Sequence, residues 1–276
     1  MADDDDRDED ERYSDKAEMD DLLRTAADVF GLDLEQPINA GSQANLVGIR
    51  TAHVLFSMRV DSRTYFVQDD RYGTDREAGA FNGPTTEYLD ACHRMLERLG
   101  IPLAEVASET VLRETTQVGQ FDRQTGRIRT EEPEEGKHIA RLARAVERLP
   151  VWSSGMTLGL TRDRRPGYVQ LHWPELPPRV LHEANRLRHR VSHGWEAPPH
   201  PGAEFESVEA GIIHSPAVAF LMDMHPVIRV VYRPAAGLRG QKPVLYLDRH
   251  GRPVPMPRQA DIPAEPAVER TAIRTQ

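Results

Sequence analysis

Short stretches in which every second residue is apolar, separated by turn residues, do most to limit the fold of this 276-residue chain. One stretch covers residues 54–60, and two more, at residues 156–160 and 169–173, flank a turn that contains Pro166 and Gly167. A period of two is typical of strands with one buried face. Two such strands joined by a short polar turn predict an antiparallel hairpin.

Other segments extend the pattern and place helices between the strands. Apolar stripes with a period near 3.6 predict helices at residues 16–30, 88–99, 139–149 and 177–194. Further strands are expected at residues 65–68, 109–121, 208–214, 217–222, 227–232 and 244–247. Because strands linked by hairpin turns pair antiparallel, we predict an α+β fold of antiparallel sheets with helices packed on one face.

Two long segments share an order of elements. A helix followed by strands that close on an Asp-Arg turn runs from Thr85 to Arg127 and again from Pro177 to Arg252. The unequal spacing leaves two interpretations, a degenerate duplication or a chance likeness. The predicted divisions are a disordered acidic tail at 1–18, a first α+β unit at 19–136, a second α+β unit with a histidine-rich helix at 137–258, and a flexible proline-rich C-terminal tail at 259–276.

The formal net charge of −9 lies entirely in the first 21 residues, which hold twelve acids and three bases. The rest of the chain is balanced, with 32 residues of each sign. A neutral body lacks the basic field that phosphate backbones require, so nucleic acid is not the expected partner. The acidic run has two interpretations: a solubility tail, or a segment that shields a basic surface or recruits a basic partner.

The start of the sequence is acidic, whereas a secretory leader has a basic region followed by an apolar one. No apolar run approaches the roughly 18 residues that a membrane-spanning helix needs. The single cysteine, Cys92, lies in an apolar helical stripe and cannot form an internal disulfide. We therefore predict a cytoplasmic protein with no membrane contact.

Histidine is concentrated in one part of the chain, with seven of eleven between residues 172 and 225. On the predicted helix 177–194, His182, His189 and His193 share the side opposite the apolar stripe. His189 and His193 are one turn apart and have the spacing of two metal ligands, with a third available from His172 or His214. The alternative is a solvated polar face that binds no metal.

The neighbours of these histidines favour the solvated face, because Arg186 and Arg190 beside the stripe repel a divalent cation. We therefore expect no cofactor, with a histidine-bound divalent metal as the alternative. Arg229, on the predicted strand 227–232, is a further candidate because strand arginines there fit an anion-binding groove. The full set of candidate ligand-facing residues is His172, His182, His189, His193, His214 and Arg229.

Two short phrases give the chain a resemblance to a known family. Leu149-Pro150-Val151-Trp152 leads into a predicted strand, and Asp122-Arg123-Gln124-Thr125-Gly126 closes an earlier one. Over about 60 residues these phrases resemble PepSY and thermolysin-propeptide-type modules, small α+β units in which a helix packs on a curled antiparallel sheet. The resemblance implies a noncatalytic module that binds or restrains another protein, often a peptidase.

No complete catalytic motif is present, since the sequence has no Gly-x-Ser-x-Gly elbow and no Walker A loop. Two functions therefore stand side by side. The first is a noncatalytic binding or regulatory protein with a protein partner, which the resemblance implies is a peptidase. The second is a metal- or histidine-dependent enzyme whose site lies between the helix at 177–194 and the hairpin at 155–173. Catalytic residues, substrate and oligomeric state are not assigned by the sequence.

Overall fold

The computed structural model describes residues 20–32, 39–43, 46–60, 62–72, 79–122, 126–130, 134–218, 221–234, 242–254 and 271–275. It has mixed α and β structure around a 13-stranded sheet that is mostly antiparallel. Three predicted segments lie outside the described residues. They are the tail at residues 1–18, residues 123–125 of the PepSY-like phrase, and residues 259–270 of the predicted C-terminal tail. Residues 271–275 form a strand that pairs parallel with residues 115–119.

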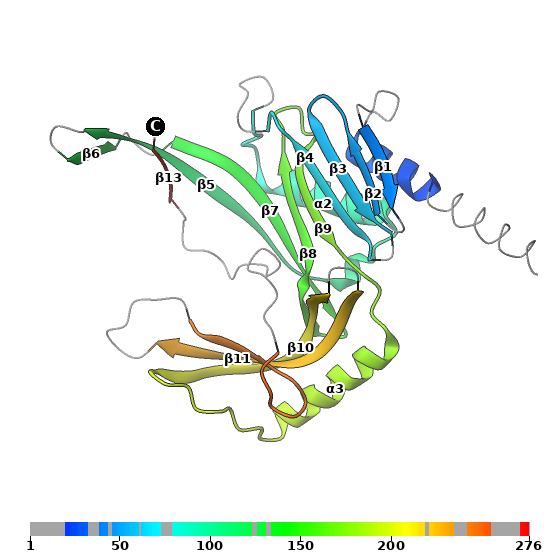
Figure 1. Cartoon of the computed structure of the whole chain (residues 1–276), viewed down its shortest axis with the longest axis vertical. Helices are drawn as coiled ribbons and strands as arrows, with labels where there is room; N and C mark the ends of the chain where they lie inside the picture. The colour runs from blue at the N-terminus through cyan, green and yellow to red at the C-terminus, as the bar shows by residue number, and fades with distance from the viewer. Residues whose placement is uncertain are drawn as a thin grey trace, which may run out of the picture.

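The main path of the sheet runs β1-β2-β3-β4-β9-β8-β10-β11-β12, and β7, β5, β6 and β13 branch from β8. Figure 1 shows two long ribbons that extend away from strands β1–β4, one formed by β5 with β7 and the other by β10 with β11. The strands are β1 (Asn39–Gln43), β2 (Leu46–Arg50), β3 (Val54–Arg59), β4 (Thr64–Asp69), β5 (Val106–Asp122), β6 (Arg127–Thr130), β7 (Glu134–Val146), β8 (Leu149–Leu160), β9 (Pro166–His172), β10 (Ala203–Val218), β11 (Leu221–Pro234), β12 (Val244–Leu247) and β13 (Thr271–Thr275).

Helices cover separate parts of the sheet. A helix at residues 20–30 and α2 (Thr85–Arg98) bury their apolar sides in one core with strands β2, β3, β4, β7, β8 and β9. The short 3-10 helix η1 (Leu103–Glu105) follows α2. Helix α3 (Pro178–Ser192) packs on β10 and β11 instead, where Leu187 meets Ala210 and Ile228. Each of these amphipathic helices is stabilised chiefly by the apolar area that it removes from water.

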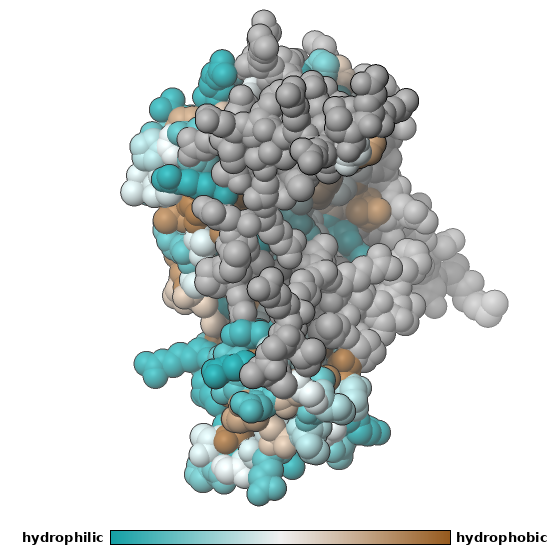
Figure 2. All heavy atoms as spheres, turned by 90° about the vertical axis from the view of Figure 1, so that its left-hand side faces the viewer, coloured by the Kyte–Doolittle hydropathy of each residue, from teal (hydrophilic) through white to brown (hydrophobic). Residues whose placement is uncertain are grey.

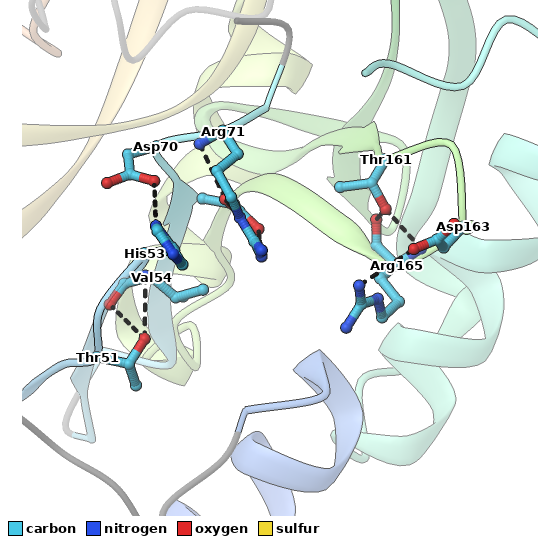
Figure 3. Close-up of polar contacts among 9 residues, drawn as sticks. Thr51, His53, Val54, Asp70, Arg71, Thr161, Asp163 and Arg165 are labelled. Atoms are coloured by element: carbon cyan, nitrogen blue, oxygen red, sulfur yellow. Dashed lines mark hydrogen bonds and ion pairs between the residues drawn. The ribbon is translucent and has the colours of Figure 1, made fainter. Parts of the chain in front are cut away.

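Most predicted elements are present. The predicted strands at 54–60, 65–68, 156–160 and 169–173 correspond to β3, β4, β8 and β9, and the predicted helices at 88–99 and 177–194 correspond to α2 and α3. Polar contacts close the adjoining turns (Figure 3). Val54 N–H donates to Thr51 Oγ1 at 3.0 Å, and Thr161 Oγ1 donates to the Arg165 carbonyl at 3.2 Å.

The predicted helix at 139–149 is wrong, because residues 134–146 form strand β7. Buried residues there recur at every second position, His138, Ala140, Leu142 and Arg144, whereas the prediction rested on a 3.6-residue spacing. The same apolar residues fit both periods, and pairing with β5 and β8 decides for the strand. The predicted boundary between residues 136 and 137 consequently falls inside β7.

Strand β8 changes partners along its length. Its second half pairs with β9, whereas Val151 in its first half lies beside Ile212 of β10 in parallel register. Between the two halves, the pairing with β7 jumps from Gly155 opposite Ala143 to Val151 opposite Arg144, so residues 152–154 of β8 form a bulge. Bulges bend a strand and increase its twist, and this one directs the β10–β11 ribbon away from the first part of the sheet.

The two-residue turn between β7 and β8 has a backbone conformation that a substitution can test. Glu147 and Arg148 both have positive φ, 51° and 65°, as a type I′ hairpin turn requires. This conformation costs an L residue about 1–2 kcal/mol, and glycine avoids that cost. Since the side chain of Arg148 is exposed, we expect Arg148→Gly to raise the free energy of unfolding by about 0.5–1 kcal/mol in chemical denaturation.

The matched control is Arg186→Gly, an exposed arginine inside α3. Glycine lowers the stability of a helix interior by about 1 kcal/mol, so this variant should be destabilised. A loss of stability in both variants would show that the β7–β8 turn does not have this conformation.

Candidate functional site

The histidines of α3 lie on its outer side, as the sequence predicts. His182, His189 and His193 are exposed. The rings of His189 and His193 have centroids 3.9 Å apart, and His193 Nδ1 lies 2.7 Å from the His189 carbonyl oxygen. Within the part of the chain that the structure describes, no group of three or more His, Cys, Asp or Glu residues has an arrangement that could hold a metal ion.

Arg229 lies apart from these histidines on β11. It is half-buried, and its guanidinium carbon is 5.8 Å from the centroid of the Trp152 ring, within the range of a cation-π contact. The side chain also lies close enough to Glu209 to lower the pKa of that carboxyl, although burial raises this pKa by more. Arg229 thus connects the bulge of β8 to the β10–β11 ribbon.

The other two candidates, His172 and His214, meet at the point where β9 and β10 diverge. Their ring centroids are 4.6 Å apart and the rings are nearly perpendicular, at 77°. His172 Nδ1 is hydrogen-bonded to Thr64 Oγ1 at 2.6 Å. The His214 side chain is 5% exposed, and neither ring nitrogen has a hydrogen-bond partner among the described residues.

The bulge of β8 explains why these rings meet. His172 is the last residue of β9 and lies opposite Gly155, immediately after the bulge. His214 lies two residues after Ile212. Ile212 is paired with Val151, the last residue of β8 before the bulge. The His214 N–H donates to Ser153 Oγ at 2.6 Å, so a side chain of the bulge satisfies this buried backbone donor.

Burial keeps both imidazoles neutral at neutral pH. It lowers the pKa of His172 to about 4, with the positive charges of Arg144 and Arg59 adding to the shift. Burial also lowers the pKa of His214 to about 3, with further contributions from His172, Arg144 and His225. Two adjacent imidazolium ions in this place would repel each other and would lack water, so the pair resists protonation.

Arg144 supplies the fixed positive charge beside the pair. Its side chain is 4% exposed, its Nε donates to Glu105 Oε2 at 2.8 Å, and its NH1 donates to the Pro174 carbonyl at 2.6 Å. Trp173 Nε1 donates to the same Glu105 oxygen at 2.9 Å. The buried charge of Arg144 is stable while it keeps these partners. Removal of either Arg144 or Glu105 would leave the charge of the other buried and unpaired.

A second feature is the side of the sheet opposite α2, which faces the viewer in Figure 1. Strand register places alternate residues of seven strands on this side, and we call these positions the helix-free face. They are Leu46, Gly48 and Arg50 of β2, Leu55, Ser57 and Arg59 of β3, Thr64, Phe66 and Gln68 of β4, Tyr168, Gln170 and His172 of β9, Gly155, Thr157 and Gly159 of β8, Lys137, Ile139, Arg141 and Ala143 of β7, and Ser108, Thr110 and Leu112 of β5.

Contacts between strands confirm that these side chains share one side. The rings of Phe66 and Tyr168 pack edge to face with centroids 5.9 Å apart, and Tyr168 Oη donates to Gln170 Oε1 at 3.2 Å. Arg141 is close enough to oppose the rise in the pKa of Tyr168 that burial causes. Most of the positions are exposed or half-buried, and the exposed fractions of Leu46 and Leu55 are 44% and 41%.

The charge on the helix-free face is mainly positive. The charged residues among its positions are Arg50, Arg59, Lys137 and Arg141, while acids come at the next alternate positions, the exposed Asp70 after Gln68, and Glu114 after Leu112. The sequence pattern does not indicate this face, because it predicts a helix at residues 139–149 where β7 and the start of β8 lie. The available signal is the alternation within β7, which puts lysine and arginine at positions 137 and 141 and apolar residues at 140 and 142.

Other surfaces differ from this face. Figure 2 shows mainly hydrophilic residues at the end of the molecule that α3 and the β10–β11 ribbon form. None of the helices in the described ranges is both long enough and apolar enough to cross a membrane. The long apolar side chain Phe205, 53% exposed, is on β10 and lies outside the helix-free face.

Comparisons with known proteins leave the family open. No family model matches the chain, and no curated protein matches it. A solved structure of an uncharacterized protein from Eubacterium rectale ATCC 33656 is similar, with 12% sequence identity and a TM-score of 0.48. The match covers 88% of this chain and 82% of that one.

The histidine pair predicts a pH dependence of stability. Each imidazole has a pKa near 6.5 in the unfolded chain and a lower pKa in the folded protein, so below pH 6.5 the unfolded state binds more protons. The free energy of unfolding should therefore fall as the pH is lowered from 6.5 toward 4, by up to about 1.4 kcal/mol per pH unit for each histidine. Urea denaturation at several pH values measures this slope.

A variant identifies the source of the slope. His214→Phe removes one titrating group and places an apolar ring in the buried position, so the acid-side slope should decrease by the contribution of one proton. His182→Phe, at an exposed position of α3, serves as the control and should keep the slope of the unchanged protein. Equal slopes in the two variants would contradict burial of a neutral imidazole at position 214.

Proposed function

We propose that this chain is a noncatalytic binding or regulatory protein of the cytoplasm that holds a protein partner on the helix-free face. The single observation that carries the proposal is the seven-strand surface on which all four charged residues are cations. A sheet that buries one side normally presents a solvated polar side, but a random polar side mixes both signs. A broad surface of mainly positive charge, with aromatic rings at its centre, fits a partner with acidic residues.

Two finer interpretations belong to this proposal. The resemblance to PepSY and thermolysin-propeptide-type modules extends it to a peptidase as the partner. A degenerate duplication, with helices on one face of each copy, would make the β10–β11 ribbon with α3 a counterpart of the first part of the sheet. The separate packing of α2 and α3 on different strands is compatible with that arrangement.

A second candidate function is a histidine-dependent enzyme, and one observation favours it. His172 and His214 place two neutral imidazoles next to each other, with His172 hydrogen-bonded to Thr64, and a neutral imidazole is the form that acts as a general base. The proposed site differs from the original prediction, since it uses no histidine of α3. If the protein is an enzyme of this kind, the unchanged protein turns over a substrate and His172→Gln abolishes that turnover. If it is a binding protein, neither the unchanged protein nor the variant shows turnover.

The binding proposal is tested with charge-reversed variants of the full chain. Arg50→Glu with Arg141→Glu reverses the sign at two separated points of the helix-free face. We expect a partner that the unchanged protein captures from native cytosol to lose at least tenfold in affinity, since like charges across an interface oppose association. The measurement is titration of the purified partner, identified by mass spectrometry, at low and moderate ionic strength.

The matched control is Arg179→Glu with Arg186→Glu, which reverses two exposed arginines of α3. This variant has the same net charge as the face variant and should bind as the unchanged protein does. Equal losses in both variants would assign the effect to net charge, and loss in the α3 variant alone would place the partner on α3. Either result contradicts the proposal.

A further inference from the structure

We propose that the acidic N-terminal segment of this chain, residues 1–18, docks on the helix-free face and competes there with the partner. The inference rests on the proposed function, because it assigns a regulation to the same surface. It gives the segment the role of an internal competitor.

Charge complementarity is the first support. Residues 1–18 hold ten acids and three bases, while the chain after residue 21 is balanced. The helix-free face has four cationic positions, with Asp70 and Glu114 at the next alternate positions of the chain at its border, although acids and bases are equally frequent in the part of the chain that forms it. The strongest acidic run of the sequence therefore has a surface of opposite sign within the same molecule.

The length of the segment is the second support. The helix that follows it, residues 20–30, packs by Phe30 against Phe56 and Tyr65 on the buried side of the sheet. Eighteen extended residues span up to about 60 Å. Seven adjacent strands about 4.8 Å apart are about 29 Å wide, so the segment is long enough to pass the sheet edge and cross the face.

The expected contact is weak and reversible. A segment joined to its own binding surface has an effective concentration on the order of millimolar, so a low intrinsic affinity is enough for occupancy. Exposed charges are screened over about 8 Å at physiological ionic strength, so salt releases the segment. A partner with acidic residues would then displace it from Arg50 and Arg141.

Paramagnetic relaxation in the full chain tests the docking. A nitroxide on Ala2→Cys reports what the segment approaches, and Cys92 does not compete for the label because burial raises the pKa of its thiol to about 12. Amides of Gly48 and Thr157 on the helix-free face are compared with Ala184 and Leu187 in α3. We expect several-fold stronger broadening on the face at low salt, and its loss at 0.5 M salt, where the Debye length is about 4 Å.

Two variants make the result specific. Arg50→Gln with Arg141→Gln should abolish the excess broadening, whereas Arg179→Gln with Arg186→Gln should retain it. A third variant leaves the folded body untouched: replacement of Asp3, Asp4, Asp5 and Asp6 by asparagine should remove most of the excess and increase the affinity for the partner.

Broadening that is equal on the face and on α3, or that persists in the Arg50→Gln, Arg141→Gln variant, overturns the inference. The failure is distinguishable from failure of the proposed function. If the segment does not approach the face while the charge-reversed variants still lose the partner, the binding function stands and the internal competitor is wrong. If those variants keep the partner, the proposed function itself is wrong.

Discussion

The course of the sheet depends on the bulge at which β8 exchanges partners, and one hydrogen bond there joins β8 to β10 beside the pairing of Val151 with Ile212. Residues 152–154 leave the ladder with β7, and the buried His214 N–H would then have no acceptor. Ser153 Oγ accepts it at 2.6 Å and so attaches β10 to the bulge. An unsatisfied buried donor lowers the free energy of unfolding by about 1–3 kcal/mol, so the Ser153 hydroxyl stabilises the fold by accepting this hydrogen bond. The bulge bends the path of the sheet and brings His172 and His214 together.

The same bend separates two packing environments. Before it, α2 and the helix at residues 20–30 fill the core on one side of the sheet, while in the described ranges the opposite side carries strand side chains and the Tyr72 ring, which lies against Lys137. After it, α3 packs on β10 and β11. Of the cations of the helix-free face, Arg50 is exposed and Arg59, Lys137 and Arg141 are half-buried, while Arg144 at the bend is buried with Glu105 and Trp173.

Much of the fold follows from local pattern. The period-two stretches of β3, β8 and β9 and the apolar stripes of α2 and α3 are strong in the sequence, and the exposure of His182, His189 and His193 follows from helix geometry. Strand β7 could not be predicted, because the spacing of Ile139, Leu142 and Val146 fits a helix while its pairing depends on β5, which is distant in sequence. The helix-free face and the contact between His172 and His214 arise from such long-range register and have no local signal.

Chemical protection in the partner complex tests the binding function most directly. The complex formed by the full chain is treated with an arginine- and lysine-modifying reagent, and each modification rate is compared with that of the free protein by mass spectrometry. We expect Arg50, Lys137 and Arg141 to become protected while Arg179 and Arg186 of α3 react at unchanged rates. Unchanged reactivity at the first three residues, with protection on α3, would contradict a binding surface on the helix-free face.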